Sequence, residues 1–280
     1  MKRTWLNAPA LAGAALVLSP FYLVVANSAK TSAQIVISPI SPPRGVGQLL
    51  ENLSNVIGNQ NFSFWASFAT SMAVTAVSLS LLTLFSSMAA WALCRCKNRL
   101  STLVFMAFVA SMAVPFQVVM LPLLSVYRTV QAATGVRMLQ SIFGLVFAYL
   151  GFGGAMSIFV LHGFVKGIPY ELEEAAAIDG CSRAGAFFRI VFGLLRPAQV
   201  TVLILNGVWI WNDFLLPSLL LGLNGRTKTL PVAVSSFVGS FVKQWDLILA
   251  AALLAMLPIV VLFVFAQRYI IRGMVEGAIK

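Results

Sequence analysis

Six long apolar runs constrain the fold of this chain more than any other feature of its sequence. They lie near residues 9–26, 65–93, 102–124, 138–161, 197–221 and 247–266. A helix needs about 20 mostly apolar residues to cross the hydrocarbon core of a bilayer. With 60% hydrophobic residues, 10% charged residues and a mean hydropathy of +0.92, the chain is too apolar for a water-soluble protein. We therefore predict an all-α, polytopic membrane protein with six transmembrane helices.

The connections between the runs are too short for a soluble catalytic domain of ordinary size. We expect one transmembrane domain over residues 1–280, and the segment 29–64, rich in Ser, Pro, Gly and Asn, does not resemble a separate domain. A cleaved signal peptide is the second interpretation of the first run, because Lys2 and Arg3 precede it. Its apolar stretch is longer than a usual signal core, so retention as the first span is the simpler prediction.

Positive charges divide unevenly between the two sides that six crossings would create. Twelve of the 19 Lys and Arg residues fall on the side of the termini, and seven fall in the longer segments opposite. The tightest group, Arg95, Lys97 and Arg99, lies in a short connection, where charge influences orientation most. We therefore expect both termini in the cytoplasm. The net charge of +11 then reflects membrane topology, and we expect no nucleic-acid partner.

The Cys and His residues do not form a metal-binding pattern. Cys94 and Cys96 are close in sequence, Cys181 is distant, and His162 is the single histidine. These spacings do not match a structural zinc site, so we expect no metal and no cofactor. All three cysteines fall on the predicted cytoplasmic side, where thiols stay reduced. We interpret His162 as a packed or interfacial side chain rather than a proton relay.

Half of the eight acidic residues lie within nine positions, between the fourth and fifth apolar runs. They are Glu171, Glu173, Glu174 and Asp179. Pro169 suits the first position of a helix, carboxylates stabilise its first turns, and three alanines continue it. The sequence therefore predicts a short acidic helix in a cytoplasmic loop, residues 163–196, which we call the coupling loop.

A sharp turn and a second helix follow in the coupling loop. Gly180 can adopt a positive φ and end the first helix, and Ser182 can cap the next one. We expect Leu172 and Phe187 to anchor the two helices on apolar neighbours, while the alanines leave a flat surface for another protein. The carboxylates lie on different helix faces near water with no histidine beside them, so we assign no catalytic residue.

The coupling loop resembles the Glu-Ala-Ala (EAA) motif of permease subunits of ATP-binding-cassette (ABC) importers. Glu174, Ala175, Ala176 and Gly180 match that motif. Segments 211–217, 229–231 and 267–273 also resemble carbohydrate-importer permeases, in particular the shorter maltose-type permease. The resemblance covers nearly the whole chain and implies the fold of a type I ABC importer permease, placed in the cytoplasmic (inner) membrane of a bacterium or archaeon.

This resemblance also implies partners, because no Gly-rich phosphate loop ending in Gly-Lys-Ser/Thr occurs in the sequence. The partners are an ABC ATPase dimer, a second homologous permease and an extracytoplasmic solute-binding protein. The chain is then not an enzyme, and it moves a sugar or oligosaccharide by alternating access. The residues implied to dock on the ATPase are Glu174, Ala175, Ala176, Asp179 and Gly180.

Polar and aromatic residues near the outer part of the fifth run form a candidate substrate pathway. They are Asn206, Trp209, Trp211, Asn212 and Asp213. Indole rings stack on sugar faces and amides bond hydroxyl groups, but Trp also marks membrane interfaces and Asn joins helices. We place the structural interpretation slightly ahead of the substrate interpretation.

One departure from the family pattern is Gly193, which stands where a proline is usual, although Pro197 keeps the later proline. This difference leaves the bend between the coupling loop and the fifth run open. The alternative function is a self-sufficient secondary transporter, which needs coupling-ion residues near the membrane midplane. A membrane-embedded enzyme is a further alternative and needs a polar catalytic cluster. The acidic residues instead lie in the coupling loop or toward the outer ends of the runs.

Overall fold

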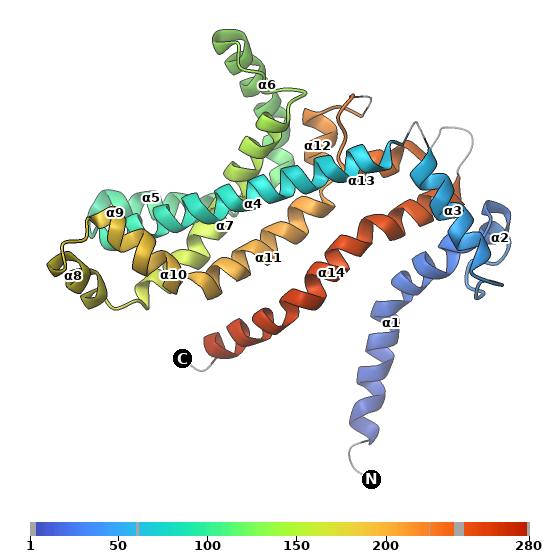
Figure 1. The fold of residues 1–280 in the computed structure, drawn as a ribbon, viewed down its shortest axis with the longest axis horizontal. Helices are drawn as coiled ribbons and strands as arrows, with labels where there is room; N and C mark the ends of the chain where they lie inside the picture. The colour runs from blue at the N-terminus through green and yellow to red at the C-terminus, as the bar shows by residue number, and fades with distance from the viewer. Residues whose placement is uncertain (1–3, 60–61, 224, 238–243, 279–280) are drawn as a thin grey trace. The chain divides into compact units, whose positions relative to one another are not determined.

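The computed structural model describes residues 4–59, 62–223, 225–237 and 244–278. Within these ranges every regular element is helical, which confirms the predicted all-α class (Figure 1). The chain divides into two compact units, described separately below. The first comprises residues 1–69 and 229–260, and the second comprises residues 70–228 and 261–280.

The first unit is built around a buried lysine. Its elements are α1 (Thr4–Ser28), α2 (Ser32–Ile37), α3 (Gly47–Gly58), the start of α4 (Phe64–Arg95), α13 (Leu230–Val234), the 3₁₀ turn η2 (Ser235–Phe237) and the first part of α14 (Trp245–Ala278). Lys30 Nζ donates to Asn27 Oδ1 at 2.8 Å, and Asn52 Nδ2 of α3 donates to the Lys30 carbonyl at 2.9 Å. Ser32 Oγ donates to Asp246 Oδ1 at 2.7 Å and joins α2 to α14.

The second unit packs three long helices against one another. It contains the rest of α4, α5 (Arg99–Ser111), α6 (Phe116–Thr134), α7 (Ile142–Lys166), α8 (Glu171–Ile178), α9 (Arg183–Ala186), the π-helical turn η1 (Phe187–Val191), α10 (Phe192–Leu194), α11 (Arg196–Asn212) and α12 (Leu215–Leu220). Within this unit α4, α7 and α11 run alongside one another, with α8 and α9 at one end and α12 at the other (Figure 1).

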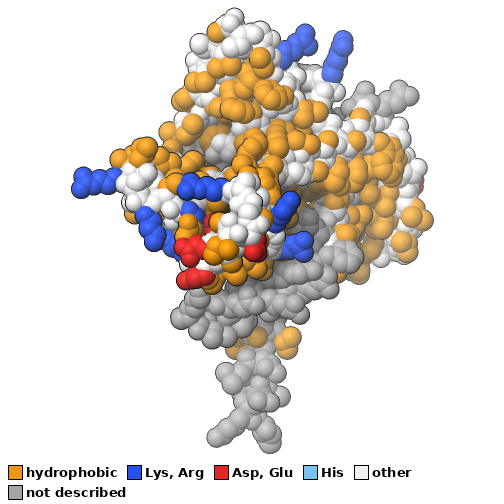
Figure 2. Space-filling model, turned by 60° about the vertical axis from the view of Figure 1, so that its left-hand side comes forward, with side chains coloured by type: hydrophobic (Ala, Val, Ile, Leu, Met, Phe, Trp, Pro, Cys, Tyr) orange, Lys and Arg blue, Asp and Glu red, His pale blue; other side chains and the backbone are white. Residues whose placement is uncertain are grey.

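Two apolar clusters hold the ends of this three-helix packing. One includes Leu82 of α4, Tyr149 of α7 and Ile210 of α11, all at most 4% exposed. The other, next to the coupling loop, includes Leu161 of α7 and Phe187 of η1, at 0% and 1% exposed. Around that end charged side chains gather, whereas apolar side chains cover much of the neighbouring surface (Figure 2). This distribution suits a helix bundle whose sides face lipid.

Three of the predicted spans coincide with single helices that are long and apolar enough to cross a membrane. They are Pro9–Ser28, Phe64–Arg95 and Ile142–Lys166. They correspond to the apolar runs predicted at 9–26, 65–93 and 138–161. The run predicted at 247–266 lies within α14.

The span predicted at 102–124 is not one straight helix, because α5 and α6 meet at an angle of 109°. Pro115 causes this break: it has no N–H to donate to the carbonyl of Ser111, and α5 ends at Ser111. If each bent helix pair is one crossing, the described residues supply up to five spans, so the sixth crossing stays a prediction.

The span predicted at 197–221 is also interrupted. α11 ends at Asn212, and Asp213 has extended backbone before α12 begins. At the other end, α11 bends by 71° from the segment 183–194. Pro197 cannot donate to the carbonyl of Gly193, so the bend is present although position 193 itself is not proline.

Candidate functional site

The turn after α8 has the geometry that its sequence predicts. Gly180 has a φ of +82°, in the left-handed region that glycine adopts without steric cost. Its N–H donates to the carbonyl of Ala177 at 3.1 Å, and the N–H of Cys181 donates to the carbonyl of Ala176 at 2.9 Å. These two bonds form a Schellman motif, which ends α8 at a defined residue.

The second helix of the coupling loop begins where predicted, and the first begins slightly later than predicted. Ser182 Oγ accepts a hydrogen bond from the N–H of Gly185 at 3.1 Å and caps α9. α8 begins at Glu171, two residues after Pro169, which lies in the connection from α7. The predicted helix–turn–helix is therefore confirmed.

α8 has an exposed face and a buried face. Glu174, Ala175, Asp179 and Gly180 are exposed, whereas Ala176 is 5% exposed and faces the protein interior. Four of the five predicted docking residues are thus accessible to a partner, and Ala176 supports α8 from within.

The two predicted apolar anchors of the coupling loop behave differently. Phe187 is 1% exposed and packs as predicted, but Leu172 is 41% exposed, so its prediction as an anchor is wrong. Ile178, at the end of α8, is 86% exposed. Large apolar side chains on α8 therefore lie at the surface, beside its carboxylates.

Glu173 is buried, so the prediction that it lies near water is wrong. Its side chain is 8% exposed and forms a salt bridge with Arg95 at the end of α4, with 2.7 Å between Arg95 Nε and Glu173 Oε1. Trp91 Nε1 donates to Glu173 Oε2 at 2.9 Å. Both carboxylate oxygens are hydrogen-bonded, which offsets the cost of removing the charge from water. A hollow of about 770 Å³ lies beside this contact, between α4, α8 and α9.

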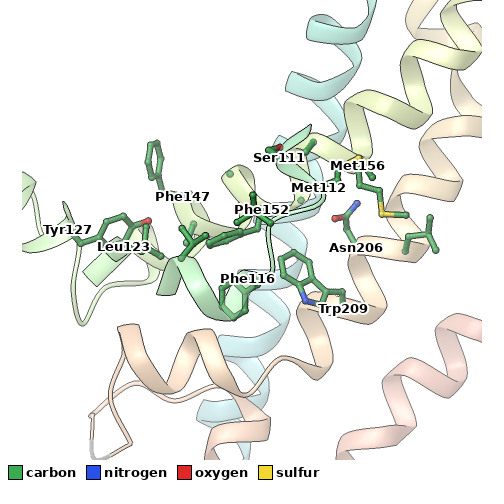
Figure 3. A pocket seen from close by; sticks show the side chains of 17 residues that line it. Ser111, Met112, Phe116, Leu123, Tyr127, Phe147, Phe152, Met156, Asn206 and Trp209 are labelled. Carbon is green, nitrogen blue, oxygen red and sulfur yellow. The ribbon is translucent and has the colours of Figure 1, made fainter. Parts of the chain in front are cut away.

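A second, mostly apolar cavity of about 640 Å³ lies where the α5–α6 break meets α7 and α11 (Figure 3). Its lining includes Met112, Phe116, Phe152, Met156, Asn206 and Trp209. The side chains of Phe116 and Trp209 lie near each other on its lower side in this view. The cavity offers aromatic faces with few polar groups, an arrangement common in small-molecule sites.

Two of the predicted pathway residues line this cavity. Asn206 Nδ2 donates to Ser157 Oγ and to the carbonyl of Val202, each at 3.0 Å, and so joins α11 to α7. Trp209 stands edge-on to Tyr149 with 5.4 Å between ring centroids. Both residues therefore have packing contacts as well as a place at the cavity.

The other three predicted pathway residues are not among the cavity lining. Trp211 is buried at 5% exposure, and Asn212 Nδ2 donates to the carbonyl of Val208 in its own helix at 2.8 Å. Asp213 accepts a hydrogen bond from the Tyr149 hydroxyl at 3.0 Å. It accepts another at 2.9 Å from the N–H of Leu215, the first residue of α12. Their contacts are those of helix packing and capping.

Comparison with known proteins decides the family. Residues 82–276 match the family described as binding-protein-dependent transport system inner membrane components. The chain belongs to this family. It is a multi-pass permease, the inner-membrane component of an ABC transporter, and the matched range includes both the coupling loop and the cavity.

Named relatives and a solved structure agree with this assignment. The permease is 38% identical over 94% of its length to the "Probable starch degradation products transport system permease protein AmyC" of Thermoanaerobacterium thermosulfurigenes, covering 92% of that protein. It is 36% identical over 93% of its length to the "Melibiose/raffinose/stachyose import permease protein MelC" of Bacillus subtilis, covering 91% of that protein. Its fold matches a chain of a bacterial ABC transporter involved in the import of alginate, with a TM-score of 0.79, 18% identity and 95% of each chain covered.

Sequence reasoning missed the contact of Glu173 with Arg95 and Trp91 in this permease. Arg95 and Glu173 lie 78 positions apart, and no local pattern joins them. Glu173 and Ala176 lie three residues apart and share a helix face, but only the structure shows that this face is buried.

Proposed function

We propose that this permease is the membrane-spanning subunit of an ATP-driven importer of a sugar or oligosaccharide. The observation that carries the proposal is α8, a short exposed helix, ended by the Schellman turn at Gly180 and anchored from beneath by Glu173. A rigid projecting helix of this kind suits a groove on a separate ATPase. Glu174, Ala175, Asp179 and Gly180 form its contact surface, and Ala176 keeps that surface in place.

The partners follow from the family and the substrate class from the relatives. A binding-protein-dependent system requires a solute-binding protein outside and an ATPase inside, and a second homologous permease completes the pathway. AmyC is named for starch degradation products and MelC for melibiose, raffinose and stachyose, which supports a sugar as the transported solute. The permease hydrolyses no ATP itself.

Transport proceeds by alternating access. ATP-bound closure of the ATPase dimer displaces α8, opens the pathway outward and admits the sugar from the binding protein. Hydrolysis returns the pathway to its inward-facing state. Asn206 and Trp209 lie on this pathway, because they line the cavity beside the α5–α6 break.

All 280 residues form one transmembrane domain with six crossings in this proposal. Three are the long helices, two are the bent pairs, and the sixth is α14. Both termini and the coupling loop lie in the cytoplasm, since twelve of the 19 cations fall on that side.

Reconstitution tests the proposal. The permease, its partner permease, the ATPase and the binding protein are placed in liposomes, and uptake of a labelled starch-derived oligosaccharide or of raffinose is measured. We expect uptake that requires internal ATP and continues when ionophores remove ion gradients. Uptake driven by an ion gradient without ATP would contradict the proposal and favour a secondary transporter.

A further inference from the structure

The salt bridge between Arg95 and Glu173 joins α8 to a transmembrane helix far away in sequence. α8 itself packs on α9 and η1, which follow it directly in the chain. The salt bridge gives α8 a further contact, with the end of α4. Its two residues, Arg95 and Glu173, are 78 positions apart in the chain. A displacement of α8 can therefore be transmitted to α4 through this salt bridge, in addition to the covalent connections of α8 to α7 and α11.

Arg95 holds more than one part of the coupling loop. Its Nη2 donates to the carbonyl of Ile168 at 3.0 Å, in the connection between α7 and α8. Its guanidinium carbon lies 5.4 Å from the ring centroid of Tyr170, at a cation–π distance. Arg95 thus contacts the segment that leads into α8 as well as Glu173 within α8.

Trp91 completes the contact from the α4 side. Its Nε1 donates to Glu173, and its ring lies 5.1 Å from the ring of Phe187, which follows the turn. α4 therefore touches the coupling loop before, within and after α8. The charged pair is well shielded, with 18% of the Arg95 side chain and 8% of the Glu173 side chain exposed. In such surroundings an ion pair is screened little by salt and its geometry is held closely.

α4 continues from this contact into the helix packing around the cavity. Leu82 of α4 packs with Tyr149 of α7 and Ile210 of α11 in one apolar cluster. Tyr149 in turn contacts Trp209, which lines the cavity. Packed interiors deform little, so a shift at the Arg95 end of α4 reaches this cluster.

We propose that Arg95 and Glu173 are positioning residues that make α4 move together with α8 when the ATPase changes conformation. This inference rests on the proposed function. The exposed face of α8 binds the ATPase, and the buried pair transmits its movement to α4. Loss of the pair therefore separates ATP hydrolysis from transport, whereas loss of the exposed face removes ATPase binding.

The test uses the complete reconstituted transporter and compares Glu173→Gln and Arg95→Gln with Glu51→Gln. Glu51 is an exposed carboxylate of α3, outside the coupling loop, and provides the control for loss of a carboxylate charge. Three quantities are measured: ATPase binding, ATP hydrolysis and sugar imported per ATP hydrolysed. We expect ATPase binding to stay near the wild-type value in all three variants. Sugar imported per ATP falls roughly fivefold or more in the first two, within the range of coupling energies between sites, and is unchanged in Glu51→Gln.

A cross-linking variant separates movement from folding. Arg95→Cys and Glu173→Cys are combined in a background where the native cysteines, Cys94, Cys96 and Cys181, are changed to Ser. A short bis-methanethiosulfonate cross-linker, which forms a reducible disulfide with each cysteine and releases sulfinate, then joins α4 to α8. We expect low import per ATP before cross-linking, recovery after it, and loss again on reduction.

Three results would overturn the inference. Import per ATP that is unchanged in Glu173→Gln and Arg95→Gln would show that the pair transmits nothing. A cross-linked protein that transports no better than its reduced form would show the same. Loss of ATPase binding in these variants would make the pair a support for docking only. Absence of ATP-dependent uptake by the wild-type assembly would instead refute the proposed function, on which this inference rests.

Discussion

Replacing Gly180 is expected to weaken ATPase binding in a graded series. The residue has a φ of +82°, and open space surrounds the position that a Cβ atom would occupy. A side chain there meets no neighbour, so its whole cost comes from the backbone. An L-residue in the left-handed region costs about 1–2 kcal/mol, and Asn tolerates that region better than Ala. Gly180→Pro is more severe, because Pro fixes φ near about −65° and removes the N–H that bonds Ala177.

These costs convert into binding constants if the free variant relaxes out of the left-handed turn and the ATPase recognises only the formed turn. Each 1.4 kcal/mol corresponds to about tenfold in an equilibrium constant, so Gly180→Ala raises the Kd for the ATPase by about 5- to 30-fold. Gly180→Asn raises it less, and Gly180→Pro abolishes binding and uptake.

Titration of labelled ATPase against the permease in nanodiscs measures this Kd, and membrane insertion is checked alongside. Gly163→Ala is the control, since Gly163 lies in α7 with open space around it and no positive φ. Wild-type affinity in Gly180→Ala, or an effect of Gly163→Ala as large as that of Gly180→Ala, would refute the reasoning.

Three further predictions concern the exposed face of α8 and the cavity. Ala175→Arg places a bulky charge on the docking face, so we expect loss of ATPase association and uptake with normal membrane insertion; retained ATP-driven uptake would contradict it. Gly153→Ala puts a Cβ atom 2.7 Å from Asn206 Oδ1, so thermal unfolding should show a loss of about 1–3 kcal/mol. Gly154→Ala, with no atom within 4 Å of the added Cβ, is its control, and equal melting of the two variants would count against the close α7–α11 contact. Trp209→Ala removes an aromatic wall of the cavity, so we expect lower uptake with unchanged ATPase binding, and unchanged uptake would exclude this residue from the pathway.

Local chemistry made the turn of the coupling loop predictable. A glycine after an alanine-rich helix and a serine before the next helix act through bonds to residues only a few positions away. Gly180 and Ser182 therefore have their predicted geometry. The three uninterrupted apolar helices, Pro9–Ser28, Phe64–Arg95 and Ile142–Lys166, were predictable for a similar reason, because the length of an apolar run is read directly from the sequence.

Contacts between distant residues were not predictable in the same way. Glu173 reads as one more solvated carboxylate until α4 brings Arg95 and Trp91 to it. Pro115 was a local sequence signal for the break between α5 and α6. The uniformly apolar character of residues 102–124 nevertheless favoured the prediction of one continuous helix. Asp213, one of the polar residues of the candidate pathway, accepts a hydrogen bond from Tyr149, which lies 64 positions earlier in the chain, and no local pattern joins these two residues.

Cross-linking from the tip of α8 tests the central claim most directly. A photo-crosslinking amino acid is placed at position 178 in place of Ile178, which is 86% exposed, or at position 37 in place of Ile37, which is 82% exposed. Illumination of the assembled transporter should yield an ATPase adduct from position 178 and none from position 37. No ATPase adduct from position 178, or equal adducts from both positions, would contradict docking of the ATPase on α8.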